Sequence, residues 1–225
     1  MSERIRKTEL RHRYSAGNQE SFSEADRRIA RYGCGLIGLA DLILYLRERT
    51  WKEGGAGETG IHSGPVYDAF VRRMDHRLAR ARRKVGLNGF SMAAAFNSRA
   101  RKRGWKLRAR WGVPREKLLS SIREMLARDI PVILSVGPGF GRREHMKGTT
   151  LYRGDTPADR AFEHYVTVIG MEETGEKIWL RVMSWGREFR IDAEEYLRGV
   201  DRSIPLLGRF FSNILYIREI GLRPR

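Results

Sequence analysis

The sequence is poor in cysteine: its 225 residues include one, Cys34. A single cysteine excludes an intramolecular disulfide and a cysteine-based zinc site. The first 15 residues are polar and lack the apolar core of a signal peptide. No apolar run reaches the roughly 18 residues that a membrane span needs. These absences are typical of a soluble protein of the reducing cytoplasm, so we expect cytoplasmic localisation and no membrane span.

Acidic residues are also scarce. Lys and Arg number 44 against 27 Asp and Glu, so the formal net charge is +17, and only eight of the 44 are lysine. Such an excess is typical of proteins that bind nucleic acid, an anionic membrane surface or an acidic partner, and it also arises from arginine-rich codon usage alone. We therefore expect salt-dependent polyanion binding, carried by basic clusters at 72–84 and 99–110.

The first half of the chain has the apolar periodicity of helices. From Leu36 to Leu46, apolar residues recur at helical spacing and predict a mostly buried helix over about residues 34–49. The glycine-rich stretch 52–60 ends it as a loop. Further helices are predicted over residues 65–84, 91–104 and 114–128.

The last third changes to short β-rich segments joined by turns. Strands are predicted over residues 105–111, 129–137, 164–172, 177–185, 187–192 and 213–220. Asp192 can cap a short helix after the fifth of these strands, and the glycine-rich residues 137–160 predict a long functional loop. Because helices come first and antiparallel strands follow, the pattern favours an α+β fold over a doubly wound sheet.

The chain shows neither an internal repeat nor a clear linker. We expect residues 1–20 to be a basic, flexible lead-in and residues 21–225 to form one domain with two lobes. The helical lobe covers about residues 21–128, and the sheet lobe about residues 129–225.

Cys34 lies between two glycines at the start of the predicted buried helix. The thiolate is the nucleophilic form, and the unpaired N–H groups and dipole of a helix N-terminus favour negative charge there. The Cys34 N–H can also donate to an oxyanion. Gly33 and Gly35 allow a tight helix start and a close approach of substrate. The pattern indicates a nucleophile, although a lone cysteine before an apolar helix is also typical of a buried core residue.

A nucleophilic cysteine needs a base. His164 follows a loop and opens a predicted strand, where a side chain is held firmly and stays accessible. The remaining histidines fall in the lead-in, in glycine-rich loops or in a basic helix: His12, His62, His76 and His145. The sequence therefore predicts a dyad of Cys34 and His164.

The order of these motifs resembles a known family. A "GCG" that opens a long apolar helix, a helix followed by "PVIL", then "HYVTVIG" and a strand ending in "SWG" are similar to the papain-like cysteine peptidase superfamily. The bacterial leader peptidases that process bacteriocins are a closer likeness than papain itself, and the resemblance covers about residues 28–220. It implies a helical lobe whose long Cys-bearing helix packs on a C-terminal antiparallel sheet, with Cys34 as nucleophile and His164 as base.

Three positions of the family pattern need comment. The family orients its histidine with an Asn or Asp two residues before the Trp, and Met183 stands there; strand alternation predicts that the adjacent Ser184 points to the other face. The family's oxyanion glutamine precedes the cysteine by several residues, and Arg28 stands six residues before it. Arg28 and the Cys34 N–H are therefore the oxyanion candidates, and Trp185 keeps the family's apolar shield.

Three functions remain open from the sequence. The first is a cysteine hydrolase, a peptidase or amidase with a preference for acidic substrates; an amine in place of water would make it an acyltransferase. The second is a catalytically inactive binding module on the same fold, which Met183 and Arg28 favour. The third is a nucleic-acid-binding protein that uses its arginine-rich faces, with Trp105 and Trp111 among the basic residues 99–111. No cluster has metal-ligand spacing, so we expect neither metal nor cofactor.

Overall fold

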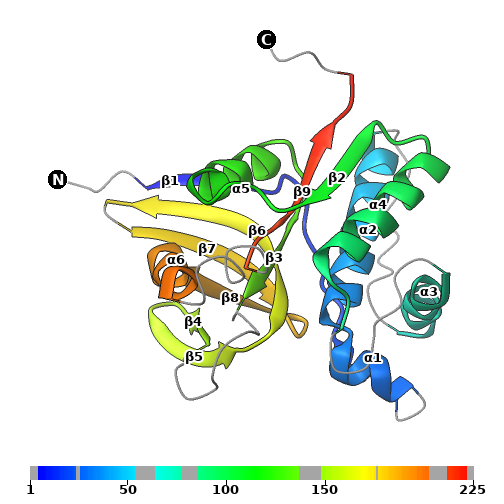
Figure 1. Cartoon of the computed structure of the whole chain (residues 1–225), viewed down its shortest axis with the longest axis horizontal. Coiled ribbons are helices and arrows are strands. Elements are labelled where there is room, and N and C mark those ends of the chain that lie inside the picture. Colours follow the sequence, from blue (N-terminus) through cyan, green and yellow to red (C-terminus); the bar gives the residue numbers. More distant parts are fainter. Residues whose placement is uncertain are drawn as a thin grey trace.

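The computed structural model describes residues 5–23, 26–53, 64–77, 86–136, 148–175, 177–202 and 212–221. It combines helices with an antiparallel sheet, so the predicted α+β class is confirmed (Figure 1). Helices α1 to α4 gather on one side of the molecule, whereas α5 and α6 lie against the sheet. The described helices are η1 (Gln19–Ser21), α1 (Arg27–Tyr32), α2 (Cys34–Glu53), α3 (Gly64–Arg77), α4 (Gly89–Lys102), η3 (Arg115–Lys117), α5 (Leu118–Ala127) and α6 (Ala193–Arg202).

Helix α2 is the central helix of this arrangement. All of its residues from Gly35 to Leu46 are buried, because α3, α4 and strand β6 (His164–Thr174) pack around it. This confirms the mostly buried helix that the apolar periodicity predicts. A helix buried on all sides is fixed in place by apolar contacts, so its first residue is a rigid point of the fold.

The main sheet is antiparallel, and its strands follow the order β1-β6-β7-β8-β4-β5. Strand β3 pairs with residues 164–168 of β6, and β1 pairs with residues 170–173 on the same edge of β6. The remaining strands of this sheet are β1 (Arg6–Glu9), β3 (Val132–Val136), β4 (Thr149–Arg153), β5 (Thr156–Ala161), β7 (Lys177–Ser184) and β8 (Arg187–Asp192).

Two further strands form a separate ribbon, β2 (Leu107–Trp111) and β9 (Leu215–Glu219). An isolated bridge between Leu134 and Ile214 connects the ribbon to β3. The Asn97 side chain of α4 bonds both the N–H and the carbonyl of Ala109, at 2.7 and 2.9 Å, which covers the free edge of β2.

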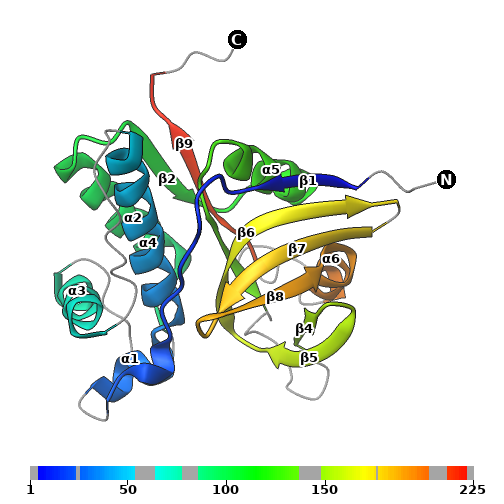
Figure 2. The ribbon, with the colours of Figure 1, turned by 180° about the vertical axis from the view of Figure 1, so that it is seen from behind.

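The predicted lead-in is structured over residues 5–20. Its first part is β1, and the segment that follows, residues 10–18, runs between the helices and the sheet to reach α1 (Figure 2). We call residues 10–18 the crossing segment. Tyr14 is buried, and His12 Nδ1 lies 2.9 Å from Oδ2 of the buried Asp129. The polar residues 5–20 are held in place by contacts with residues far away in the sequence, so their composition alone does not predict that they are structured.

The predicted long loop over 137–160 is partly a hairpin. Residues 149–161 form β4 and β5, which pair with each other, while residues 137–147 lie outside the described residues. The other predicted strands and helices occur with shifted ends where the structure describes them; the end of the predicted helix 65–84 lies outside the described residues from 78 on. Asp192 caps α6 as predicted by accepting from the N–H groups of Glu194 and Glu195.

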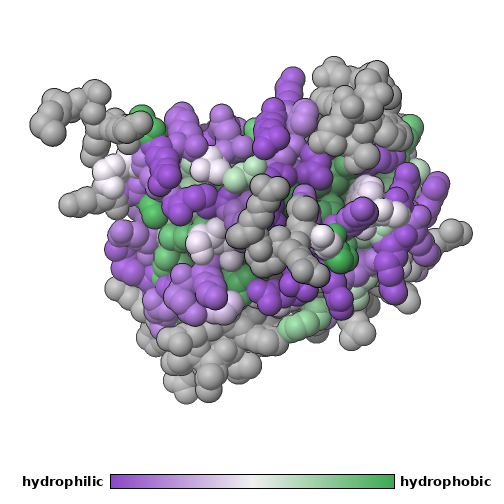
Figure 3. Space-filling model, turned by 90° about the horizontal axis from the view of Figure 1, so that it is seen from above, coloured by the Kyte–Doolittle hydropathy of each residue, from purple (hydrophilic) through white to green (hydrophobic). Residues whose placement is uncertain are grey.

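No helix in the described ranges is both long and apolar enough to cross a bilayer. Seen from above, the described surface carries mostly hydrophilic side chains, with apolar residues in small separate areas (Figure 3).

Candidate functional site

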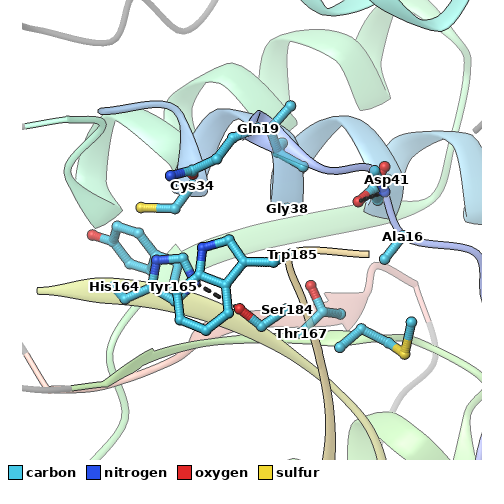
Figure 4. Close-up of a pocket in the computed structure, with 13 residues that line it drawn as sticks. Ala16, Gln19, Cys34, Gly38, Asp41, His164, Tyr165, Thr167, Ser184 and Trp185 are labelled. Atoms are coloured by element: carbon cyan, nitrogen blue, oxygen red, sulfur yellow. Dashed lines mark hydrogen bonds between the residues drawn. The ribbon is translucent and has the colours of Figure 1, made fainter. Parts of the chain in front are cut away.

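A small cavity of about 30 Å³ lies where the start of α2 meets β6 and β7. It is large enough for about two water molecules. Its lining includes both residues of the predicted dyad, Cys34 and His164, together with Ser184 and Trp185 from the end of β7 (Figure 4). Two segments more than a hundred residues apart therefore contribute to one site, as the sequence predicts for Cys34 and His164.

Cys34 is the first residue of α2 and is partly buried. Gly33 accepts the first helical hydrogen bond, from Ile37 N–H at 2.8 Å. A Cβ on Gly33 would lie 2.3 Å from the carbonyl oxygen of Ile29, so the chain turns here in a space that only glycine fits. Gly35 is also tight, since a Cβ there would lie 3.0 Å from the Tyr165 ring. The glycines thus hold the thiol close to β6.

Burial raises the pKa of the Cys34 thiol above its ordinary value. Hydrogen bonding from the backbone N–H groups of Tyr165, Gly35 and Cys34 opposes this rise. The expected stabilisation of a thiolate at the helix start is therefore present, but loss of hydration outweighs it. At neutral pH the thiol is protonated.

His164 opens β6 and is buried. Its Nε2 lies 2.8 Å from Oγ of Ser184, and its ring stacks on Trp185 with centroids 4.6 Å apart and planes 16° apart. Burial lowers the pKa of His164 to about 4, and the charge of Asp159 opposes this in part. The imidazole is neutral at pH 7, so it can accept a proton.

Ser184, rather than Met183, contacts the histidine. The expectation that Ser184 points to the other face is wrong. Ser184 is the last residue of β7 and still pairs with Arg187 of β8, so its contact with His164 depends on how β7 is aligned with β6. Met183 also lines the cavity and pairs with Thr167 in the strand register.

Trp185 and Gly186 form the two-residue turn between β7 and β8, and both have positive φ, 47° and 70°. Such turns favour Asn-Gly, because a residue with a Cβ pays about 1–2 kcal/mol for the left-handed conformation. Glu163, directly before His164, has φ 45°. Backbone strain on both sides of a stacked histidine is typical of a functional site.

Arg28 does not line the cavity. Its guanidinium forms a two-point ion pair with Asp75 of α3, one contact being Nη1 to Oδ1 at 2.8 Å. Asp75 is almost fully buried and needs a cation beside it. The prediction that Arg28 serves the oxyanion is therefore wrong.

Gln19 is the residue that sequence reasoning missed. It begins η1, lines the cavity, and its side-chain amide points toward Cys34 (Figure 4). It stands 15 residues before Cys34, and α1 lies between η1 and α2. The signal available in the sequence was Asn18, which caps η1 by accepting from the Glu20 N–H at 3.0 Å.

Asp41 lies two turns after Cys34 on α2 and also lines the cavity. Its carboxyl accepts from the Gly17 N–H at 2.9 Å and from the Tyr67 hydroxyl at 2.8 Å. A Cβ on Gly17 would lie 2.0 Å from the Tyr67 hydroxyl oxygen. Asp41 thus ties the crossing segment to α2 two residues before Gln19. Burial raises its pKa to about 7, although both hydrogen bonds oppose the shift.

Of the other histidines, the two that the structure describes, His12 and His76, do not line the cavity. His12 bonds Asp129, His76 is exposed on α3, and His62 and His145 lie outside the described residues. In the part of the chain that the structure describes, no group of three or more His, Cys, Asp or Glu side chains is placed to hold a metal ion. Comparisons with protein-family models, curated proteins and solved structures find no match to this chain.

Proposed function

We propose that the chain is a papain-like cysteine hydrolase that cleaves peptide or amide bonds. The observation that carries the proposal is the shared cavity of Cys34, His164, Ser184 and Gln19. The arrangement of elements supports it: a cysteine starts a buried helix, a histidine opens the facing strand, and the next strand supplies the histidine's partner.

The mechanism starts from a neutral pair. In the tautomer that carries its proton on Nε2, His164 donates to Ser184 Oγ, 2.8 Å away, and Nδ1 accepts the thiol proton as sulfur attacks the substrate carbonyl carbon. The Cys34 N–H and the Gln19 amide donate to the oxyanion of the tetrahedral intermediate. Proton transfer accompanies attack, because burial holds the pKa of the thiol high and that of the imidazole low.

The intermediate collapses when the imidazolium of His164 gives its proton to the leaving amine and the C–N bond breaks. A thioester on Cys34 remains. Water then attacks the thioester carbonyl, His164 takes its proton, and the imidazolium returns that proton to the sulfur as the carboxylic acid leaves. An amine in place of water would complete an acyl transfer by the same steps.

We expect acidic peptides to be preferred substrates. The net charge of +17 raises the local concentration of anionic peptides and speeds their encounter. The second candidate, a binding module without catalysis, is favoured by one observation: the pKa of the thiol is raised.

The test is cleavage of a mixed peptide library followed by mass spectrometry. Cys34→Ala should abolish cleavage, and His164→Ala should lower its rate about 100-fold or more. Gln19→Ala should lower the rate by about as much as His164→Ala, since it removes an oxyanion donor. Ser184→Ala leaves Nε2–H buried without a partner and should lower the rate about 10- to 100-fold, whereas Ser184→Thr keeps the hydroxyl. Arg31→Gln, at an exposed position on α1, is the control on catalysis. Cleavage that persists in Cys34→Ala, or its absence in the unmodified protein, contradicts the proposal.

A further inference from the structure

The β2–β9 ribbon turns one face toward solvent. Leu107, Ala109 and Trp111 of β2 are buried, while the alternate residues Arg108 and Arg110 are exposed. On β9 the outward residues are Tyr216, which is partly buried, and Arg218, which is exposed. We call Arg108, Arg110, Tyr216 and Arg218 the basic ribbon face.

The register of the ribbon sets arginine opposite arginine. Arg108 pairs with Arg218, and Arg110 pairs with Tyr216. Like charges directly opposite each other destabilise an antiparallel pair, whereas an acid at either position would stabilise it. Within the described residues, no ion pair joins Arg108, Arg110 or Arg218 to an acid. The ribbon therefore keeps an electrostatic repulsion between Arg108 and Arg218 that does not help the fold.

The neighbouring acids do not neutralise this face. Glu124 accepts from the Tyr216 hydroxyl at 3.1 Å but is itself paired with Arg128 at 3.0 Å. Glu219 follows Arg218 along β9 and lines a different hollow together with Arg49. Positive charge continues beside the face in the exposed residues before β2, namely Arg101, Lys102, Arg103 and Lys106.

We propose that the basic ribbon face binds the phosphodiester backbone of nucleic acid. Arg108 and Arg110 are two residues apart on one strand, about 6.8 Å, which is similar to the spacing of successive phosphates along an extended strand. A guanidinium matches a phosphate with two parallel hydrogen bonds. The guanidinium of Arg110 lies over the Tyr216 ring, 5.0 Å from its centre, and this cation–π contact holds Arg110 on the basic ribbon face.

This binding is independent of the proposed hydrolase. The opposite face of the ribbon carries Trp111, whose ring packs edge-on against Tyr165 at 5.9 Å, and Tyr165 lines the cavity of Cys34. The basic ribbon face therefore points away from the cavity. Cys34→Ala should bind nucleic acid like the unmodified protein, so failure of one proposal leaves the other standing.

The test is a fluorescence anisotropy titration of a labelled oligodeoxythymidine at several salt concentrations. The triple variant Arg108→Ala, Arg110→Ala, Arg218→Ala should bind about tenfold more weakly or worse, and the slope of log K against log salt should fall by about 2. The matched control is Arg6→Ala, Arg31→Ala, Arg187→Ala, which removes the same charge from exposed positions on β1, α1 and β8. The control should stay within about twofold.

Equal weakening in both triple variants would show an effect of net charge alone and overturn the proposal. Arg218→Gln serves as a second variant, because it relieves the repulsion across the strand pair and should fold; its slope should fall by about 0.7. Polyglutamate and vesicles of anionic phospholipid are the competing probes. If either binds as tightly as the oligonucleotide and loses affinity in the ribbon variant, the face belongs to an acidic protein or a membrane surface, and the proposal is wrong.

Discussion

Trp185 occupies a backbone conformation that favours glycine or asparagine, and its indole covers the ring of His164. We expect Trp185→Asn to raise the pKa of His164 from about 4 toward about 6.5, because water then reaches the imidazole. An NMR titration of the ring protons measures this. Trp185→Phe keeps an apolar cover and should leave the pKa low. A low pKa in Trp185→Asn would show that the indole does not exclude water from the histidine.

Cys34 should behave as a buried thiol with a histidine that is already neutral. The rate of alkylation by iodoacetamide should rise with pH along a curve whose midpoint lies above that of an unperturbed thiol, because burial raises the pKa of Cys34. This reverses the sequence-based expectation of a stabilised thiolate. His164→Ala should leave the midpoint nearly unchanged, since no imidazolium is present in that pH range. A midpoint below that of free cysteine, lost in His164→Ala, would instead indicate a thiolate–imidazolium pair.

The sequence could identify Cys34 and His164 because each is a rare residue type at the start of a strongly patterned element. Gln19 could not be found by local pattern, since a whole helix, α1, separates it from the cysteine along the chain. Ser184 was discounted because the sequence does not show the register that aligns β7 with β6. Local pattern thus predicts the site residues that lie on long helices and strands. The positions of the site residues on short helices and beside turns are set by tertiary contacts.

Among the elements, the crossing segment and α2 are joined at Asp41, and this contact should make stability depend on pH. The pKa of Asp41 is about 7 in the folded protein and about 3.9 in an unfolded chain. Its contribution to stability is therefore fully present below about pH 4 and is lost as pH rises through about 7, a change on the order of 4 kcal/mol.

Denaturant unfolding at a series of pH values measures this. Asp41→Asn should flatten the fall in unfolding free energy between about pH 4 and 7. Asp155→Asn, at an exposed carboxyl, is the matched control and should keep the fall. A variant at Asp41 with an unchanged pH profile would show that this carboxyl does not retain its proton in the fold.

Helices and strands with an apolar pattern were predictable, and polar elements were not. β6 and β7 contain many buried apolar residues, in runs or in alternation with polar ones, because they form the middle of the sheet. β1 reads RKTE and β5 reads TPADRA, and nearly all of their residues are exposed or partly exposed. Such strands exist through pairing with a neighbour, a long-range contact that no local pattern predicts.

For the molecule as a whole, the net charge of +17 was evident from the sequence, but its distribution was not. On the outer side of the sheet, arginines pair with acids: Arg181 contacts Glu9 and Glu188, and Arg190 contacts Glu172 at 2.8 Å. The arginines of the ribbon lack such partners within the described residues. Arginine therefore forms ion pairs on the sheet, whereas on the ribbon its charge stays exposed.

The pairing of β1 with the far end of β6 also affects the order in which parts of the fold can form during translation. β1 finds its partner, residues 170–173, only after the long segment between them has been synthesised. Contacts of such long sequence separation form slowly, whereas the contact of Gly17 with Asp41 joins residues that are closer in the sequence. His164 and Ser184 also arrive long after Cys34. A nascent chain therefore carries the proposed nucleophile before it carries the proposed base.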